Sequence, residues 1–291
     1  MPRLTRLLAF LVLVLLAGCA GNRPDISGQD GQYYFPKQIR YGFTVSNSTG
    51  ELIKKAEFWT YLPVPVTSHQ RVKKIFANYP YRTRLDELGN NSIHFDLEDI
   101  PPYGAKVINI TVDLLMSDSP VSNALSAPAQ FLSPASHIQS DDLQIVALAK
   151  SLQEVSPALM ARNSYEWVAN NIAYEGYVSE DRDAEFAINN RKGDCTEFSY
   201  LLTAMYRAQK IPARAIGGYV FSDNGIVTAT DYHNWTEFYL DGAWQIADAQ
   251  KRIFVEQQRN YVAMRVISGN EDELGAQRFS YAGKGLQVEM N

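Results

Sequence analysis

The hydrophobic and polar positions between residues 33 and 116 follow the two-residue period of β-strands. Runs of alternating, β-branched or aromatic residues occupy four segments, which are 39–45, 56–62, 92–97 and 104–114. Turn-forming residues separate the runs, as in Asn47-Ser48-Thr49-Gly50. Short alternating strands between turns are typical of an antiparallel sandwich. Residues 33–116 are therefore predicted to form a small β-sandwich domain.

Beyond residue 116 the apolar positions change to helical spacing. Residues 117–140 contain Ser, Pro and Ala with weak periodicity, and they are predicted to link two domains. Helical spacing indicates a helix from about 141 and a second over 159–172. A third predicted helix starts near Cys195 and stops by Gln209-Lys210; its stripe is Phe198, Leu201, Leu202 and Met205. Residues 141–291 are predicted to form a second domain, which makes the fold class α+β.

The N-terminus has the pattern of an export signal. Arg3 and Arg6 precede an uninterrupted apolar run from Leu7 to Ala17, which is short for a membrane span but suits a signal peptide. The run ends in Leu16-Ala17-Gly18-Cys19, which resembles a bacterial lipobox. That resemblance implies a signal peptide over 1–18 and a lipidated Cys19, and it implies localisation to a bacterial cell envelope.

Residues 19–32 are polar and rich in Gly, Asn and Asp, and they are predicted to form a flexible tether between the anchor and the folded body. Lipid on Cys19 would be the contact with the membrane. Ala20, rather than Asp, after the cysteine resembles outer-membrane sorting, which would leave the protein facing the periplasm.

Charge and composition limit the classes of ligand. The net charge is −5, and loss of the two arginines of the signal would make it −7. No basic tract remains that would indicate nucleic-acid binding. No cofactor motif is present. Asp181, Asp183 and Glu185 alternate like calcium ligands, but the stretch lacks the glycine and terminal glutamate of an EF-hand loop, so no metal site is expected.

Cys195 is the cysteine that remains once Cys19 is assigned to lipid. It lies in Gly193-Asp194-Cys195 at the start of the predicted helix. The positive end of a helix macrodipole lowers the pKa of a thiol, so we expect the Cys195 thiolate to be favoured. The main-chain N–H of Cys195 is expected to be free to bind an oxyanion. The alternative interpretation is a buried structural cysteine.

His233 is the one histidine downstream of Cys195, and it lies on an alternating segment that predicts a strand. Asp241-Gly242 predicts a two-residue hairpin turn. With that turn, Leu240 pairs with Ala243 and Trp235 with Asp248, so His233 and Asp248 become diagonal neighbours on one face. An acid in this place can orient the imidazole, which is the arrangement of a nucleophile, a base and an orienting acid.

Together these segments resemble the transglutaminase-like superfamily. The residues that carry the resemblance lie between about 140 and 250, and they are Gly193-Asp194-Cys195-Thr196-Glu197, Ile211-Pro212-Ala213-Arg214, Gly217-Gly218-Tyr219, His233-Asn234-Trp235 and Asp248. The resemblance implies a papain-like core of helices and antiparallel sheet. It also implies that Cys195 is the nucleophile, His233 the base and Asp248 its orienting partner.

The second oxyanion donor, besides the Cys195 amide, is left open between Tyr174 and the amides of Asn170 and Asn171. The expected activity is attack of a thiolate on a peptide or amide carbonyl, with water as the acyl acceptor. An amine as acceptor, which would make the protein a transglutaminase, is an alternative. A non-catalytic scaffold lipoprotein is another. The expected partners are a peptide or protein substrate in the envelope and a protein recruited by the β-sandwich.

Overall fold

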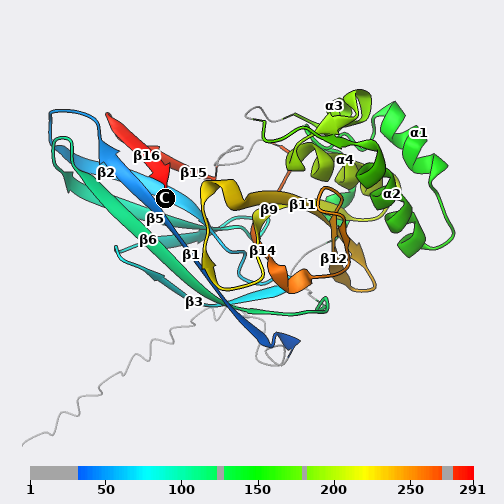
Figure 1. Ribbon diagram of the computed structural model, residues 1–291, viewed down its shortest axis with the longest axis horizontal. Helices are drawn as coiled ribbons and strands as arrows, with labels where there is room; N and C mark the ends of the chain where they lie inside the picture. The colour runs from blue at the N-terminus through cyan, green and yellow to red at the C-terminus, as the bar shows by residue number, and fades with distance from the viewer. Residues whose placement is uncertain (1–31, 123–127, 179–181, 271–277) are drawn as a thin grey trace, which may run out of the picture.

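The computed structural model describes residues 32–122, 128–178, 182–270 and 278–291. The predicted signal peptide, Cys19 and all of the tether except Gln32 lie outside the described residues. Figure 1 shows two halves: a β-sandwich on one side, and on the other a sheet covered by helices. None of the described helices is long and apolar enough to cross a membrane.

The sandwich consists of two sheets. Six of its strands are consecutive in the sequence: β1 (Phe35–Asn47), β2 (Ile53–Leu62), β3 (Gln70–Ala77), β4 (Arg82–Leu85), β5 (Asn91–Ile100) and β6 (Ala105–Met116). Strands β1, β6 and β3 pair in one sheet, and β2, β5 and β4 in the other. Three of the predicted segments lie within β1, β2 and β5, and the fourth, 104–114, lies within β6 except for its first residue. Their inward side chains include Phe43, Phe58 and Phe95, which stack at the centre of the sandwich.

The sandwich also contains strands from far along the chain. β15 (Phe279–Ala282) pairs with β2, β16 (Leu286–Met290) pairs with β1, and β10 (Gly225–Ile226) adds a short parallel bridge to β1. The prediction that residues 141–291 form one separate domain is therefore wrong for these strands. Their ladder partners are the edges of β1 and β2, which the local alternation of the sequence does not identify.

The second half is built on one sheet with the order β13-β12-β11-β9-β14. The strands are β9 (Ala213–Val220), β11 (Tyr232–Leu240), β12 (Ala243–Asp248), β13 (Ile253–Phe254) and β14 (Tyr261–Ile267). The described helices of this half lie on the other side of the core: α1 (Leu143–Ser151), α2 (Pro157–Asn171), α3 (Ala184–Asn190) and α4 (Cys195–Ala208). A two-stranded parallel ladder joins β7 (Ala173–Tyr174) to β8 (Lys192–Gly193). The α+β class is confirmed.

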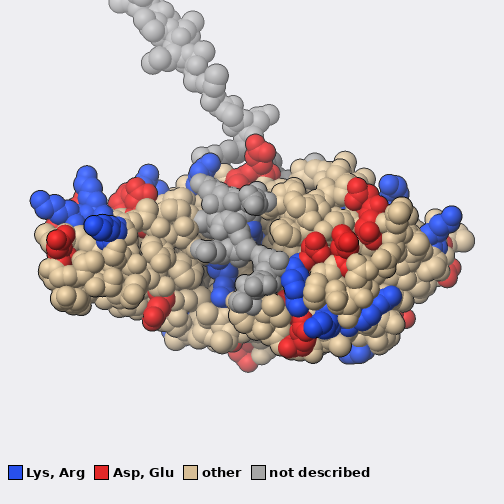
Figure 2. Space-filling model, turned by 90° about the horizontal axis from the view of Figure 1, so that it is seen from above, with Lys and Arg blue, Asp and Glu red and all other residues tan. Residues whose placement is uncertain are grey.

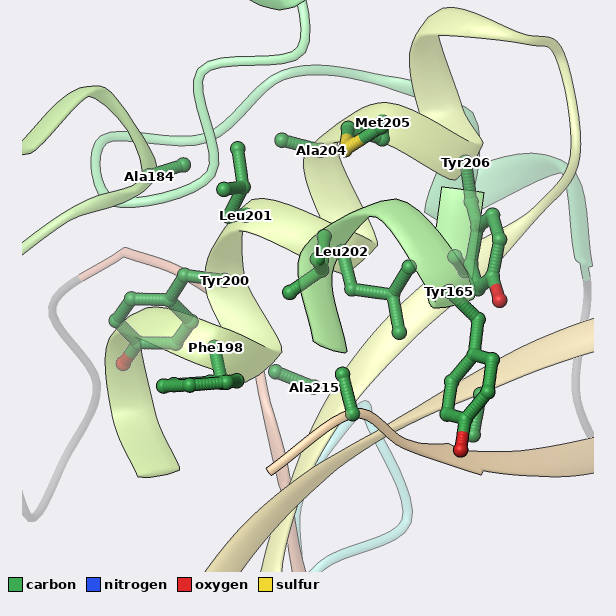
Figure 3. Close-up of a cluster of buried hydrophobic side chains, with 14 of the residues drawn as sticks. Tyr165, Ala184, Phe198, Tyr200, Leu201, Leu202, Ala204, Met205, Tyr206 and Ala215 are labelled. Atoms are coloured by element: carbon green, nitrogen blue, oxygen red, sulfur yellow. The ribbon is translucent and has the colours of Figure 1, made fainter. Parts of the chain in front are cut away.

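Helix α4 is the centre of this half, between the other helices and the sheet. Figure 3 shows its apolar side chains, among them Phe198, Leu201, Leu202 and Met205, in contact with Tyr165 of α2 and Ala215 of β9. All four stripe residues are buried. The predicted end of the helix is confirmed, since α4 stops at Ala208 and Pro212 follows. The helix is thus held rigidly, and so is the residue at its N-terminus.

The two halves share apolar contacts. Tyr219, Val262 and Met264 of the second sheet belong to the same buried cluster as the sandwich core. Phe131 and Ile138, in the segment predicted to be a linker, are also buried. On the face seen in Figure 2, Lys and Arg side chains gather at the sandwich end, while acidic and basic groups are mixed over the helical half.

Candidate active site

Cys195 is the first residue of α4, and its position is set by a capping box. Asp194 is the N-cap, and its Oδ1 accepts the Thr196 N–H at 2.7 Å. In return Glu197 Oε2 accepts the Asp194 N–H at 2.6 Å. Such reciprocal bonds satisfy donors that a helix start would leave unpaired. The Cys195 thiol is half-buried, and it is the free cysteine of the described residues.

Glycine is required at position 193 because of Glu197. A Cβ on Gly193 would lie 2.5 Å from the Glu197 Cβ, which no real contact permits. Arg182 then neutralises the Glu197 carboxylate through Nη2 at 3.1 Å, and Arg182 also pairs with Glu175. Glu197 and Arg182 were not predicted as site residues. The glutamate at the third position of a capping box was a signal for the first of them.

The pKa of the Cys195 thiol is shifted upward, whereas the sequence predicted a downward shift. Burial, and next the negative charge of Asp194, raise the pKa of Cys195 to about 12, although a hydrogen bond from the main-chain N–H of Asn234 lowers it. The prediction of a favoured thiolate is therefore wrong for the free protein. The helix terminus is accompanied by carboxylates that oppose its effect. At neutral pH the thiol needs a base to remove its proton.

His233 and Asp248 lie together as the hairpin register predicted. Asp241 and Gly242 both have positive φ, and the ladder pairs Leu240 with Ala243 and continues to Thr236 and Ala247. The His233 Nε2 lies 2.7 Å from Asp248 Oδ2, and both side chains are buried. A carboxylate can only accept, so Nε2 carries the hydrogen and Nδ1 is left with the lone pair of a base.

Asn234 connects the start of α4, which carries Cys195, to strand β11, which carries His233. It lies beyond the last pair of the β11–β12 ladder, and its main-chain N–H donates to the Cys195 thiol. Its side-chain Nδ2 donates to Thr196 Oγ1 at 3.0 Å. These bonds bring the first turn of α4 against the residue that follows His233. The structure thus collects Cys195, His233 and Asp248 from a helix and two strands.

Tyr174 lies beside the candidate nucleophile. It is 56% exposed, and the pKa of its phenol is raised by burial and then by the charges of Cys195 and Asp194. Beside the β7–β8 ladder the N–H groups of Ala173 and Glu175 donate to Arg191 O and Gly193 O, so the N–H and C=O of Tyr174 face the opposite way.

The other oxyanion candidates are engaged elsewhere. Both Asn170 and Asn171 lie in the last turn of α2, where their main-chain N–H groups belong to the helix ladder. The Asn171 side-chain amide donates to Trp167 O at 2.8 Å, and Asn170 Oδ1 accepts from Arg252. The Cys195 N–H is in the first turn of α4, where the helix supplies no acceptor. Of the oxyanion candidates, it and Tyr174 are therefore the ones that these bonds leave in place.

Of the carboxylates weighed as calcium ligands, Asp183 has another role. Asp183 caps α3 by accepting the Phe186 N–H at 2.8 Å, and its second oxygen accepts from Gln139. Asp181 lies outside the described residues. Within the described ranges, no group of three or more His, Cys, Asp or Glu side chains could hold a metal ion.

Comparison with known proteins agrees with this fold. Residues 146–249 match the model of the transglutaminase-like superfamily, so this part of the chain is a transglutaminase-like domain. A solved structure from Cytophaga hutchinsonii, described as a "putative cysteine protease", has the same fold with a TM-score of 0.57. It is 20% identical, and the match covers 88% of this chain and 92% of that chain.

A second solved structure is the periplasmic domain of TgpA from Pseudomonas aeruginosa, with a TM-score of 0.41 and 15% identity over 72% of this chain and 91% of that chain. No curated protein matches this chain.

Proposed function

We propose that this protein is a cysteine peptidase or amidase that works through an acyl-thioester on Cys195. The observation that carries the proposal is the hydrogen bond between His233 and Asp248, at 2.7 Å, beside the Asn234 amide that contacts the thiol. A non-catalytic scaffold would not need a buried histidine–carboxylate pair at the N-terminus of the cysteine helix. The scaffold alternative is therefore disfavoured.

The proposed reaction starts from a Cys195 thiol that is protonated at neutral pH. As a carbonyl carbon approaches Cys195, His233 Nδ1 takes the thiol proton, and sulfur forms a bond to the carbon. Asp248 stabilises the imidazolium that results, and the Cys195 N–H binds the oxyanion. The carbon–nitrogen bond breaks, and His233 returns the proton to the leaving amine. Water, deprotonated by His233, then adds to the thioester and releases the acid and the thiol.

The exposed edge of β7 favours an extended peptide as the substrate. The main-chain N–H and C=O of Tyr174 face away from β8, so a peptide strand could pair with them while its carbonyl reaches Cys195. The exposed Tyr174 and Tyr177 side chains offer apolar contact on the same segment. Because an amine could replace water at the thioester, transfer to an amine is the second candidate activity.

We also propose that the protein is a lipoprotein of the bacterial cell envelope, and the pattern of its N-terminal sequence supports this. Lipid on Cys19 would hold the protein on the outer membrane, facing the periplasm. The sandwich would recruit a protein partner. Metabolic labelling with a fatty-acid analogue tests the anchor: the label should appear on the wild-type protein and be lost in Cys19→Ser.

The catalytic proposal is tested by the rate at which iodoacetamide alkylates Cys195 at pH 7. His233→Ala should slow alkylation at least tenfold, since a thiol with a raised pKa depends on a base. His137→Ala is the matched control, because the His137 ring stacks on Tyr200, with the two ring centroids 5.9 Å apart. Equal rates in the wild type and His233→Ala would overturn the proposal.

Substrates are found by comparing envelope peptides cleaved by the wild type with those cleaved by Cys195→Ala. A labelled alkylamine added to the same reaction separates the two acceptors. Free acids in the products indicate hydrolysis, whereas incorporation of the label indicates amine transfer.

A further inference from the structure

Asp248 receives more than the bond from His233. Its Oδ2 also accepts the hydroxyl of Tyr261 at 2.9 Å, and its Oδ1 accepts the main-chain N–H of Lys251 at 3.0 Å. Three donors therefore hold one buried carboxylate. The Tyr261 and His233 donors share a single oxygen, so the direction of one bond constrains the other.

Tyr261 reaches this oxygen from the far edge of the sheet. It opens β14, which is separated from β11 by β9, and its ring crosses toward Trp235. The Tyr261 and Trp235 rings meet edge to face at 5.1 Å, and Trp235 in turn stacks on His233 at 6.5 Å and 23°. Tyr261, Trp235, His233 and Asp248 thus form a closed ring of contacts, with Tyr261 and Trp235 at most 2% exposed.

Apolar packing alone does not account for the hydroxyl of Tyr261. A phenylalanine would make the same edge-to-face contact with Trp235, and it would avoid burying a polar group. Burial, and next the charge of Asp248, raise the pKa of the Tyr261 phenol far above its usual value. The raised pKa favours the protonated phenol, which is the form that donates to the carboxylate.

We propose that Tyr261 is a positioning residue of the site: its hydroxyl orients the Asp248 carboxylate so that Oδ2 stays in line with His233 Nε2. Without the hydroxyl, only His233 and the Lys251 N–H hold the carboxylate, so it turns more readily about its bond to Cβ. The imidazolium that forms when His233 takes the Cys195 proton then loses part of its stabilisation. This inference rests on the proposed function, because it assigns Tyr261 to the base that activates Cys195.

The test measures iodoacetamide alkylation of Cys195 between pH 7 and pH 10.5 in the full chain. Tyr261→Phe should slow the reaction about tenfold at pH 7, as expected for the loss of one hydrogen bond to a charged group. The deficit should shrink to about twofold or less near pH 10.5, where hydroxide removes the thiol proton without His233. A merely structural defect would slow the reaction at every pH.

Tyr206→Phe is the matched control. Tyr206 is equally buried, and its hydroxyl donates to Ala161 O at 2.9 Å, away from the site. Cys195 of this variant should be alkylated at the wild-type rate over the whole pH range. A second measurement is a double-mutant cycle: Tyr261→Phe combined with Asp248→Asn should be no slower than Asp248→Asn alone, because Tyr261 acts through Asp248.

The outcomes separate the two proposals. If His233→Ala slows alkylation but Tyr261→Phe matches Tyr206→Phe at pH 7, or if Tyr261→Phe and Asp248→Asn are additive, the inference about Tyr261 is overturned and the catalytic proposal stands. If His233→Ala has no effect, the catalytic proposal fails, and the inference fails with it.

Discussion

The carboxylate of Glu197 accepts the main-chain N–H of Asp194 at 2.6 Å, so a residue inside α4 holds the peptide that immediately precedes Cys195. The Glu197 side chain is 1% exposed and pairs with Arg182. The position of the candidate nucleophile therefore depends on a buried charge as well as on the helix.

Glu197→Ala should destabilise the protein by about 3 kcal/mol, since it removes the Glu197 bond of the capping box and leaves Arg182 without its buried partner. Glu197→Gln retains an acceptor for the Asp194 N–H and should cost only about 1 kcal/mol. Chemical denaturation measures both. Glu166→Ala, at an exposed ion pair with Arg162, is the control and should cost less than about 0.5 kcal/mol. Equal losses in the Ala and Gln variants would contradict a capping role.

The raised pKa of Cys195 predicts a pH dependence of stability. The folded protein holds the thiol proton more tightly than the unfolded chain, in which the pKa is about 9. The resulting stabilisation is fully present below that pH, and it is lost as the pH rises toward the folded value of about 12. The melting temperature of the wild type should therefore fall relative to that of Cys195→Ala above about pH 9. Parallel curves for the two proteins up to pH 10.5 would show that the thiol is not perturbed.

Gly218 should tolerate no side chain, because the space over it is filled. A Cβ there would lie 2.1 Å from the main-chain oxygen of Val262 and 2.8 Å from the Trp235 ring. Gly218→Ala should cost about 2–3 kcal/mol in unfolding free energy, since main chain cannot move aside cheaply. Gly225→Ala is the matched control, where the nearest atom is 3.9 Å away. A similar stability for the two variants would argue against the contact between β9 and β14.

Leu286 tests whether the C-terminal strands are part of the sandwich. It opens β16 and is 7% exposed, within the apolar cluster between the two sheets. Leu286→Ala should lower the unfolding free energy by about 2–3 kcal/mol, as for other buried leucines. Val155→Ala, at a fully exposed position, should leave it unchanged. A neutral Leu286→Ala would mean that β16 does not pack against β1.

Local sequence patterns predict the structure correctly where one short segment determines the geometry. The hairpin register follows from Asp241-Gly242, because both residues adopt positive φ in a two-residue turn and the side-chain period of a strand is two. The proximity of His233 and Asp248 could therefore be counted from the sequence. The start of α4 near Cys195 followed in the same way from the apolar stripe of Phe198, Leu201, Leu202 and Met205. The catalytic roles of Cys195, His233 and Asp248 stay predictions.

Features that join distant segments could not be read in this way. Nothing local indicates that β15 and β16 return to β2 and β1, since a strand edge accepts any compatible strand. Nor does the spacing show that Tyr261, two strands away from β11, reaches Asp248.

The sequence by itself determined the helix that carries Cys195 and the hairpin that carries His233 and Asp248, because turn chemistry and side-chain periodicity act over a few residues. Only the tertiary structure decided the protonation of the thiol. A helix N-terminus favours the thiolate, but burial together with Asp194 outweighs it and raises the pKa of Cys195 to about 12. Burial and the distances between charges exist only once the chain has folded.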